Sequence, residues 1–128
     1  MRVLMVGYEP EAVDFSDPAL PPGLDAGKIH AGIRVALEDM RNRGWAAEQF
    51  FVRPDDQAGP MLKQMLTSGS YDCLVIGAGV RGWPRHLPVF EALINAAREA
   101  APTLPIAFNT RPEDSTAAVE RVCGGTRA

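Results

Sequence analysis

Continuous apolar runs alternate with amphipathic segments along the chain, and this alternation repeats four times. The runs predict strands at residues 2–8, 47–53, 71–78 and 104–109. After each run, apolar residues recur every three or four positions, as they do on one face of a helix. An unbroken run such as Val3-Leu4-Met5-Val6 is typical of a strand covered on both faces, which is the situation in parallel sheets. The pattern therefore predicts the order βαβαβαβα.

The predicted helices come with their own end signals and buried faces. Asp25 is a favourable N-cap for the first helix. Thr110 followed by Glu113 is a capping-box pattern for the fourth helix, whose inward face is expected to include Val122. The second helix is expected to bury a stripe made of Met61, Leu62, Met65 and Leu66.

Four parallel strands joined by right-handed crossovers form a three-layer α/β sandwich with helices on both faces. The first and third strands are the most continuously apolar, which favours the centre of the sheet. The second strand carries Glu48 and Gln49, and the fourth has Pro105 near its start, so both suit edges. The predicted strand order is therefore 2-1-3-4, as in flavodoxin-like folds. The alternative order, 3-2-1-4, would bring the polar second strand to the centre.

Length and composition narrow the class of protein. The 128 residues suit one α/β domain over 1–128, and the net charge of −3 provides no basic face for nucleic acid. No apolar stretch is long enough to span a membrane, and the first apolar run is too short for a signal peptide. Cys73 and Cys123 are fifty residues apart, without the spacing of a zinc site. These features predict a cytoplasmic protein without a cysteine-based metal site.

The predicted strand order also predicts where a ligand would bind. In open α/β sheets, ligands bind beyond the carboxyl ends of the strands, at the point where the strand order reverses. For the order 2-1-3-4, that point lies between the first and third strands. The two longest connections, 9–24 and 79–87, follow those two strands, and long loops in compact domains are commonly functional. We therefore expect a site in the crevice between these loops.

The residues at this crevice suit an anionic ligand, because arginines and helix N-termini both bind carboxylate or phosphate. His86 or Glu9 would move a proton if the protein is an enzyme. The predicted ligand-binding residues are Tyr8, Gly77, Gly79, Arg81, Asn109, Thr110 and Arg111. No cofactor is identified by the sequence.

Several alternatives stay open at this level. The acidic residues of 9–17 could bind a divalent cation, or they could pair with the arginines and fix the loops. Residues 77–82 match GxGxxG, but Trp83-Pro84 separates them from the next helix, which disfavours a dinucleotide site. The glycines would then permit a tight turn or let a ligand lie against the backbone.

Two functions are consistent with these patterns. The first is a small enzyme or enzyme-like protein that binds an anionic metabolite, such as a phosphate or carboxylate. The second is a non-catalytic interaction or sensor module whose long loops, including Trp83, dock a protein partner. A homodimer fits either function, because a four-stranded sheet has two edges and little mass to cover them.

Overall fold

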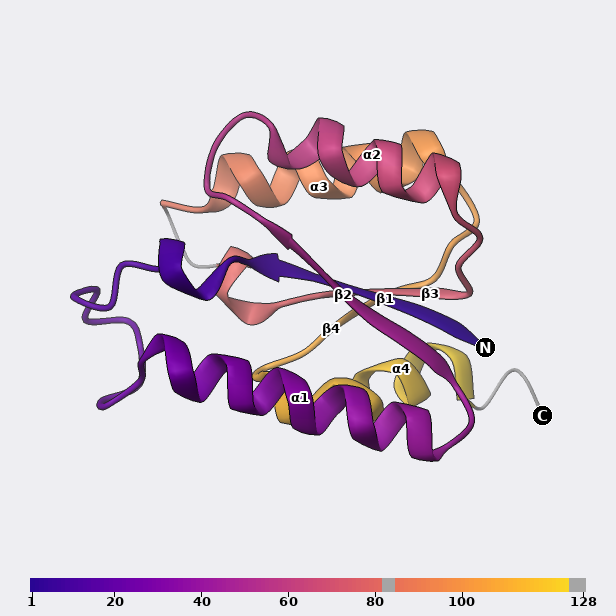
Figure 1. The fold of residues 1–128 in the computed structure, drawn as a ribbon. Coiled ribbons are helices and arrows are strands. Elements are labelled where there is room, and N and C mark those ends of the chain that lie inside the picture. The colour runs from indigo at the N-terminus through magenta and orange to yellow at the C-terminus, as the bar shows by residue number, and fades with distance from the viewer. Residues whose placement is uncertain (82–84, 125–128) are drawn as a thin grey trace.

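A computed structural model of the chain, which describes residues 1–81 and 85–124, contains one four-stranded parallel sheet (Figure 1). Its order is β2-β1-β3-β4, which confirms the order predicted from the sequence. The strands are β1 (Arg2–Tyr8), β2 (Ala46–Val52), β3 (Cys73–Ile76) and β4 (Ile106–Phe108). The two strands with the most continuous apolar runs are therefore the two central ones.

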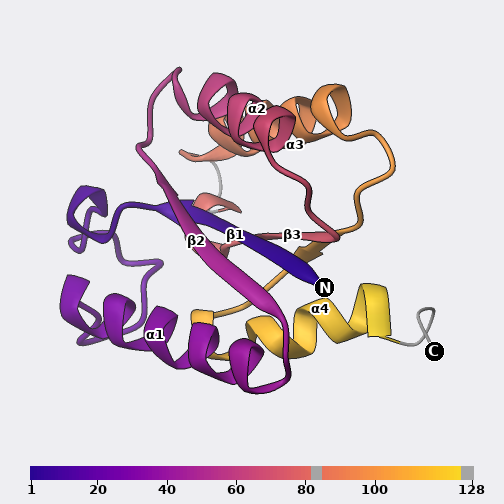
Figure 2. The same ribbon diagram turned by 45° about the vertical axis from the view of Figure 1, so that its right-hand side comes forward.

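Helices cover both faces of the sheet and complete the three layers. Helices α1 and α4 lie on one face, and α2 and α3 lie on the other (Figures 1 and 2). Their bounds are α1 (Ala26–Asn42), α2 (Ala58–Ser68), α3 (Leu87–Ala100) and α4 (Ser115–Cys123). Asp25 caps α1 as predicted, since its Oδ1 accepts a hydrogen bond of 2.8 Å from the Lys28 N–H. Among the described residues, no helix has the length and apolar character that crossing a bilayer requires.

Strand β1 supplies both hydrophobic cores, because successive side chains of a strand point to opposite faces. Leu4 and Val6 pack in the core under α2 and α3. Val3 and Met5 pack in the core over α1 and α4. All four side chains are buried, which explains why this part of the sequence has no polar position.

Helix α2 buries a narrower stripe than the sequence suggested. Met61 is 42% exposed, so its predicted place in the buried stripe is wrong. The buried side of α2 follows a spacing of four residues through Ala58, Leu62 and Leu66. Met61 lies one position outside this row, whereas Met65 is partly buried and packs against the core.

Helix α4 departs from the prediction at both ends. The prediction that Val122 faces inward is wrong, because Val122 is exposed and Cys123 is buried instead. At the start of the helix, the capping partner of Thr110 is Asp114 and not Glu113. The Asp114 carboxylate accepts hydrogen bonds from both the backbone N–H and the hydroxyl of Thr110.

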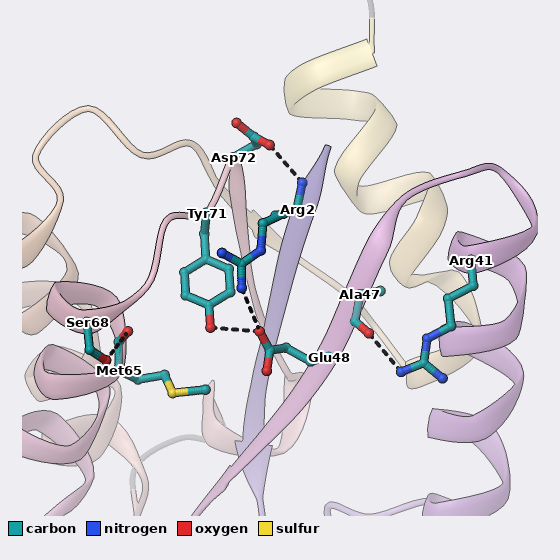
Figure 3. Close-up of polar contacts among 8 residues, drawn as sticks. All are labelled: Arg2, Arg41, Ala47, Glu48, Met65, Ser68, Tyr71 and Asp72. Atoms are coloured by element: carbon teal, nitrogen blue, oxygen red, sulfur yellow. Dashed lines mark hydrogen bonds and ion pairs between the residues drawn. The ribbon is translucent and has the colours of Figure 1, made fainter.

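Polar contacts between residues far apart in the sequence connect the strands at the amino edge of the sheet (Figure 3). The Arg2 N–H donates to Asp72 Oδ2 at 2.7 Å, which ties β1 to the segment before β3. Glu48 Oε1 on β2 accepts from the Tyr71 hydroxyl at 2.7 Å and lies 3.4 Å from Arg2 Nη2. The Arg2 guanidinium also lies 4.8 Å from the centre of the Tyr71 ring. The long loops, by contrast, follow the carboxyl ends of the strands.

The outer edge of β2 is partly covered by an arginine from α1. The Ala46 N–H donates to Met1 O, so the backbone groups of Ala46 face β1. Because alternate residues of a parallel strand face opposite neighbours, the backbone N–H and C=O of Ala47 point away from β1, toward the open edge. There, Arg41 Nη2 donates to the Ala47 carbonyl at 2.9 Å (Figure 3).

Candidate functional site

The crevice predicted from the topology lies where β1 and β3 end side by side. These strands pair from Val3 with Cys73 to Val6 with Ile76. The loop 9–24 continues from β1, and a short 3-10 helix, η2 (Ala78–Arg81), continues from β3. Both segments lie at the same end of the sheet in Figure 1. The dinucleotide interpretation of residues 77–82 gains no support, since α3 begins only at Leu87.

Tyr8 and His86 meet at this point, although they are 78 positions apart in the sequence. The Tyr8 hydroxyl is 2.9 Å from His86 Nδ1, and the ring centres are 5.0 Å apart in an edge-to-face arrangement. Tyr8 is the last residue of β1 and is buried, whereas His86 directly precedes α3 and is partly buried. The structure therefore brings a predicted ligand-binding residue into contact with a predicted proton carrier.

Burial keeps both members of this pair neutral near pH 7. Burial raises the pKa of the Tyr8 hydroxyl to about 12. It also lowers the pKa of the His86 imidazole, and the nearby Arg85 guanidinium lowers it further. When the Tyr8 hydroxyl donates to Nδ1, the neutral imidazole carries its proton on Nε2, which is then a hydrogen-bond donor.

A small cavity of about 30 Å³ lies beside the pair. This volume is enough for a water molecule and too small for a metabolite in the present arrangement. A side chain at Gly79 would find open space among the described residues, because a Cβ built there meets none of their atoms within 4 Å. Gly77 differs, since its Cβ would lie 3.4 Å from Val6 O on the neighbouring strand. The residues that line the cavity are Tyr8, Val13, Asp14, Asp17, Leu20, Gly79 and His86.

Two acidic residues that follow β1 form ion pairs with arginines, as one of the sequence-based alternatives proposed. Asp14 Oδ2 is 2.9 Å from Arg85 Nη1, and Glu9 Oε2 is 2.8 Å from Arg53 Nη1. Hydrogen bonds from Ser16, together with Arg85, lower the pKa of the Asp14 carboxyl to about 2. Glu9 is therefore held toward β2 and does not line the cavity, whereas His86 does.

Arg81 has an unusual set of partners. One of its terminal nitrogens, Nη2, donates to the Asn109 carbonyl, and its guanidinium carbon lies 5.4 Å from the centre of the Phe108 ring. Its Nε is buried and has no hydrogen-bond partner among the described residues. Within 1–81 and 85–124, no carboxylate lies at ion-pair distance from Arg81.

The remaining predicted residues gather at the end of β4, where two of them support the scaffold. The buried Asn109 side chain accepts from the Ala78 N–H at 2.9 Å and donates to the Ser115 hydroxyl at 3.0 Å. Thr110 is engaged by Asp114. Arg111 is exposed, and within the described part of the chain it makes no ion pair.

Sequence reasoning did not select every residue at this edge. Val13 and Leu20 line the cavity, but apolar residues in a proline-rich loop carry no chemical signal of their own. Arg85 lies in the predicted loop 79–87 but is not among the predicted binding residues, although it pairs with Asp14 of the acidic segment. Trp83 lies outside the described residues.

A larger hollow lies at the opposite edge of the sheet, between the C-terminal ends of α2 and α3. Its volume is about 330 Å³, but no charged residue of the described chain lines it. Among the described lining residues, the one titratable group is the Tyr71 hydroxyl, which already donates to Glu48. We therefore place the candidate site at the carboxyl edge. No group of three or more potential metal ligands is present among the described residues.

The sheet order and the position of the crevice define the chain as a doubly wound parallel α/β protein with the strand order of flavodoxin-like folds. Comparison with protein-family models, curated proteins and solved structures gave no match.

Proposed function

We propose that the protein binds a small anionic metabolite at the carboxyl edge of its sheet. The observation that carries this proposal is the partly buried guanidinium of Arg81, whose partners in the described chain are a carbonyl and an aromatic ring. A charge removed from water is normally paired with an opposite charge. A ligand carboxylate or phosphate above the turn at Ala78–Arg81 would provide that missing negative charge.

The surroundings of Arg81 support the same ligand class. Open space at Gly79 gives a ligand access to the turn, and Gly79 lines the same cavity as the Tyr8–His86 pair. If the protein catalyses a reaction, we assign the proton transfer to His86 Nε2 rather than to Glu9. Glu9 is engaged by Arg53, whereas His86 lines the cavity. Asn109 and Thr110 would act by holding the turn and β4 in place, with Arg111 as a second cation.

Thermal-shift titrations test the proposal. The probes are inorganic phosphate, pyrophosphate, a sugar phosphate, acetate and succinate, each with wild type, Arg81→Gln and Arg98→Gln. Arg98 is an exposed arginine of α3 and makes no ion pair within the described residues, so it is a matched control. At one hundred times its Kd, a ligand adds about 2.7 kcal/mol to stability. We expect at least one anion to stabilise wild type and Arg98→Gln but not Arg81→Gln.

A second variant tests the same site independently, in case Arg81→Gln does not fold. Gly79→Leu places a side chain in open space above the turn, so it should fold and block the ligand. Stabilisation that persists in both Arg81→Gln and Gly79→Leu would reject the site. A complete lack of response to every anion in wild type would reject the ligand class.

An interaction module is the second candidate, and the exposure of Phe15 and Leu87 favours it. These apolar side chains flank the Asp14–Arg85 ion pair in the sequence, on the two segments that meet at the carboxyl edge. If no anion binds, a concentration-dependent homodimer that is lost in Phe15→Ser would favour this function. Under either function, the proposed setting is the cytoplasm, without a nucleic-acid or membrane partner.

A further inference from the structure

The carboxyl edge already holds one carboxylate, and it comes from the chain itself. Asp14 lines the cavity together with Tyr8, Gly79 and His86. Its Oδ2 lies 2.9 Å from Nη1 of Arg85, the residue next to His86. The loop 9–24 thus presents an anion to an arginine at the place where the topology predicts a ligand.

The contact between Asp14 and Arg85 is easy to exchange. The two side chains are 50% and 59% exposed, and exposed ion pairs contribute little because water and salt screen them. Asp14 Oδ1 is held locally by Ser16, through the backbone N–H at 3.0 Å and the hydroxyl at 2.5 Å. Arg85 can therefore change its partner while the turn at Asp14 keeps its shape.

Arg81 and Arg85 contact segments that follow the two different neighbours of β3. Arg81 contacts the end of β4, whereas Arg85 contacts the loop that follows β1. Since β1 and β4 are the two neighbours of β3, they are separated by two strand spacings, about 10 Å. The Arg81 guanidinium has no carboxylate partner among the described residues, whereas the Arg85 guanidinium pairs with Asp14.

We propose that Asp14 is an internal stand-in for the ligand and that the ligand is a compact dicarboxylate. One ligand carboxylate replaces Asp14 at Arg85, and the other pairs with Arg81. This inference rests on the proposed function and specifies its ligand class. A second lining carboxylate, Asp17, makes a phosphate dianion less favourable on the Arg85 side, because like charges repel.

The position of Asp14 explains why the cavity is small in the present structure. With Asp14 in place, only about 30 Å³ remains beside His86. Displacement of Asp14 would move the loop 9–24 outward and enlarge the space above Gly79. Val13 and Leu20, which line the same cavity, would then contact the short carbon chain between the two carboxylates.

NMR titration of ¹⁵N-labelled protein at constant ionic strength tests this inference. The probes are succinate, with malonate and glutarate as shorter and longer homologues, acetate as a single carboxylate, and inorganic phosphate. The proteins are wild type, Asp14→Asn, Asp17→Asn and Arg85→Gln. Asn at position 14 keeps an oxygen that can accept from Ser16 but removes the charge that Arg85 binds. Asp17 lines the same cavity and makes no ion pair among the described residues, so Asp17→Asn is the matched control.

We expect Asp14→Asn to bind succinate about fivefold more tightly than wild type, because the ligand no longer competes with the Asp14–Arg85 ion pair. Asp17→Asn should strengthen binding less than Asp14→Asn, since it relieves charge repulsion but leaves Arg85 paired with Asp14. Arg85→Gln should weaken succinate binding, and acetate should bind more weakly than the best dicarboxylate. The amide signals of the loop 9–24 should shift on binding.

The possible failures are distinct. A succinate affinity of Asp14→Asn no greater than that of Asp17→Asn would overturn the role of Asp14 while the proposed anion site survives. Phosphate or acetate binding as tightly as every dicarboxylate would overturn the ligand class. Absence of binding by every probe to all four proteins would overturn the proposed function itself.

Discussion

At the scale of single residues, the Tyr8–His86 pair shows how one physical cause acts in opposite directions. Burial disfavours the charged form of any group, which is the anion for tyrosine and the cation for histidine. The pKa of Tyr8 therefore rises and that of His86 falls. Both side chains stay neutral over a wide range around pH 7, and their hydrogen bond of 2.9 Å persists over that range.

The lowered pKa of His86 predicts a stability change in mildly acidic solution. Because the folded protein binds this proton less readily than the unfolded chain, protonation favours unfolding. Stability should therefore fall as the pH drops through the ordinary histidine pKa, about 6.5, and continue to fall until the folded-state pKa is passed. Urea denaturation from pH 8 to pH 5 should show this decline in wild type and a smaller decline in His86→Gln. Identical pH profiles for the two proteins would contradict the assignment. Asp14 does not interfere, since its contribution to stability is lost only between its ordinary pKa, 3.8, and its folded-state pKa, about 2, and both lie below the range tested.

The sequence predicted which residues stand near the site better than what each of them contacts. Tyr8, Gly79 and His86 do meet, because strand order alone brings their segments together. Glu9 and Asn109 lie at the same edge, but their side chains turn to Arg53 and to the Ala78 turn. The direction in which a side chain leaves a loop depends on packing contacts that strand order does not specify.

At the scale of secondary-structure elements, Asn109 connects three parts of the fold. Its buried amide joins the end of β4 to the turn after β3 and to the first residue of α4. A single side chain thus fixes the turn at Ala78–Arg81, where the proposed anion would bind, relative to α4.

Asn109→Ala should destabilise the protein by about 1–3 kcal/mol, because it leaves the Ala78 N–H without its acceptor. Urea denaturation at pH 7 measures the change. Asn95→Ala is the comparison, since Asn95 is exposed on α3 and such changes stay within about 0.5 kcal/mol. Equal effects of the two substitutions would show that the Asn109 amide does not fix the turn.

Element order was predictable and element length was less so. The third strand was expected over 71–78 and the fourth over 104–109, yet β3 is Cys73–Ile76 and β4 is Ile106–Phe108. Apolar runs mark which residues are buried, whereas strand length depends on how many residues find a partner. β4 pairs with β3 only from Ile106 to Phe108, and Leu104 packs against the core without pairing.

At the scale of the whole molecule, the two cores are separate in space but share one sheet. Leu62 belongs to the core under α2 and α3, whereas Trp45 packs against the core over α1 and α4. Because β1 contributes side chains to both cores, loss of packing on one face should weaken the other.

Leu62→Ala should therefore lower the stability by about 2–5 kcal/mol, the range for a buried leucine. With Trp83 replaced by Phe, Trp45 is the one remaining tryptophan, and its fluorescence reports the opposite layer. We expect the fluorescence and circular-dichroism midpoints to shift together in urea. Met61→Ala, at the exposed neighbouring position, should leave both midpoints nearly unchanged. A fluorescence midpoint unaffected by Leu62→Ala would mean that the layers unfold independently.

The contact between Arg41 and the Ala47 carbonyl has a consequence for how the sheet ends. A strand added beside β2 would have to bond to the outward-facing backbone groups, and one of these acceptors is already occupied by a charged side chain. An added strand would have to displace the Arg41 guanidinium from the Ala47 carbonyl before it could pair with β2. The longer of the two sheet edges is thereby made a poor template for fibre growth.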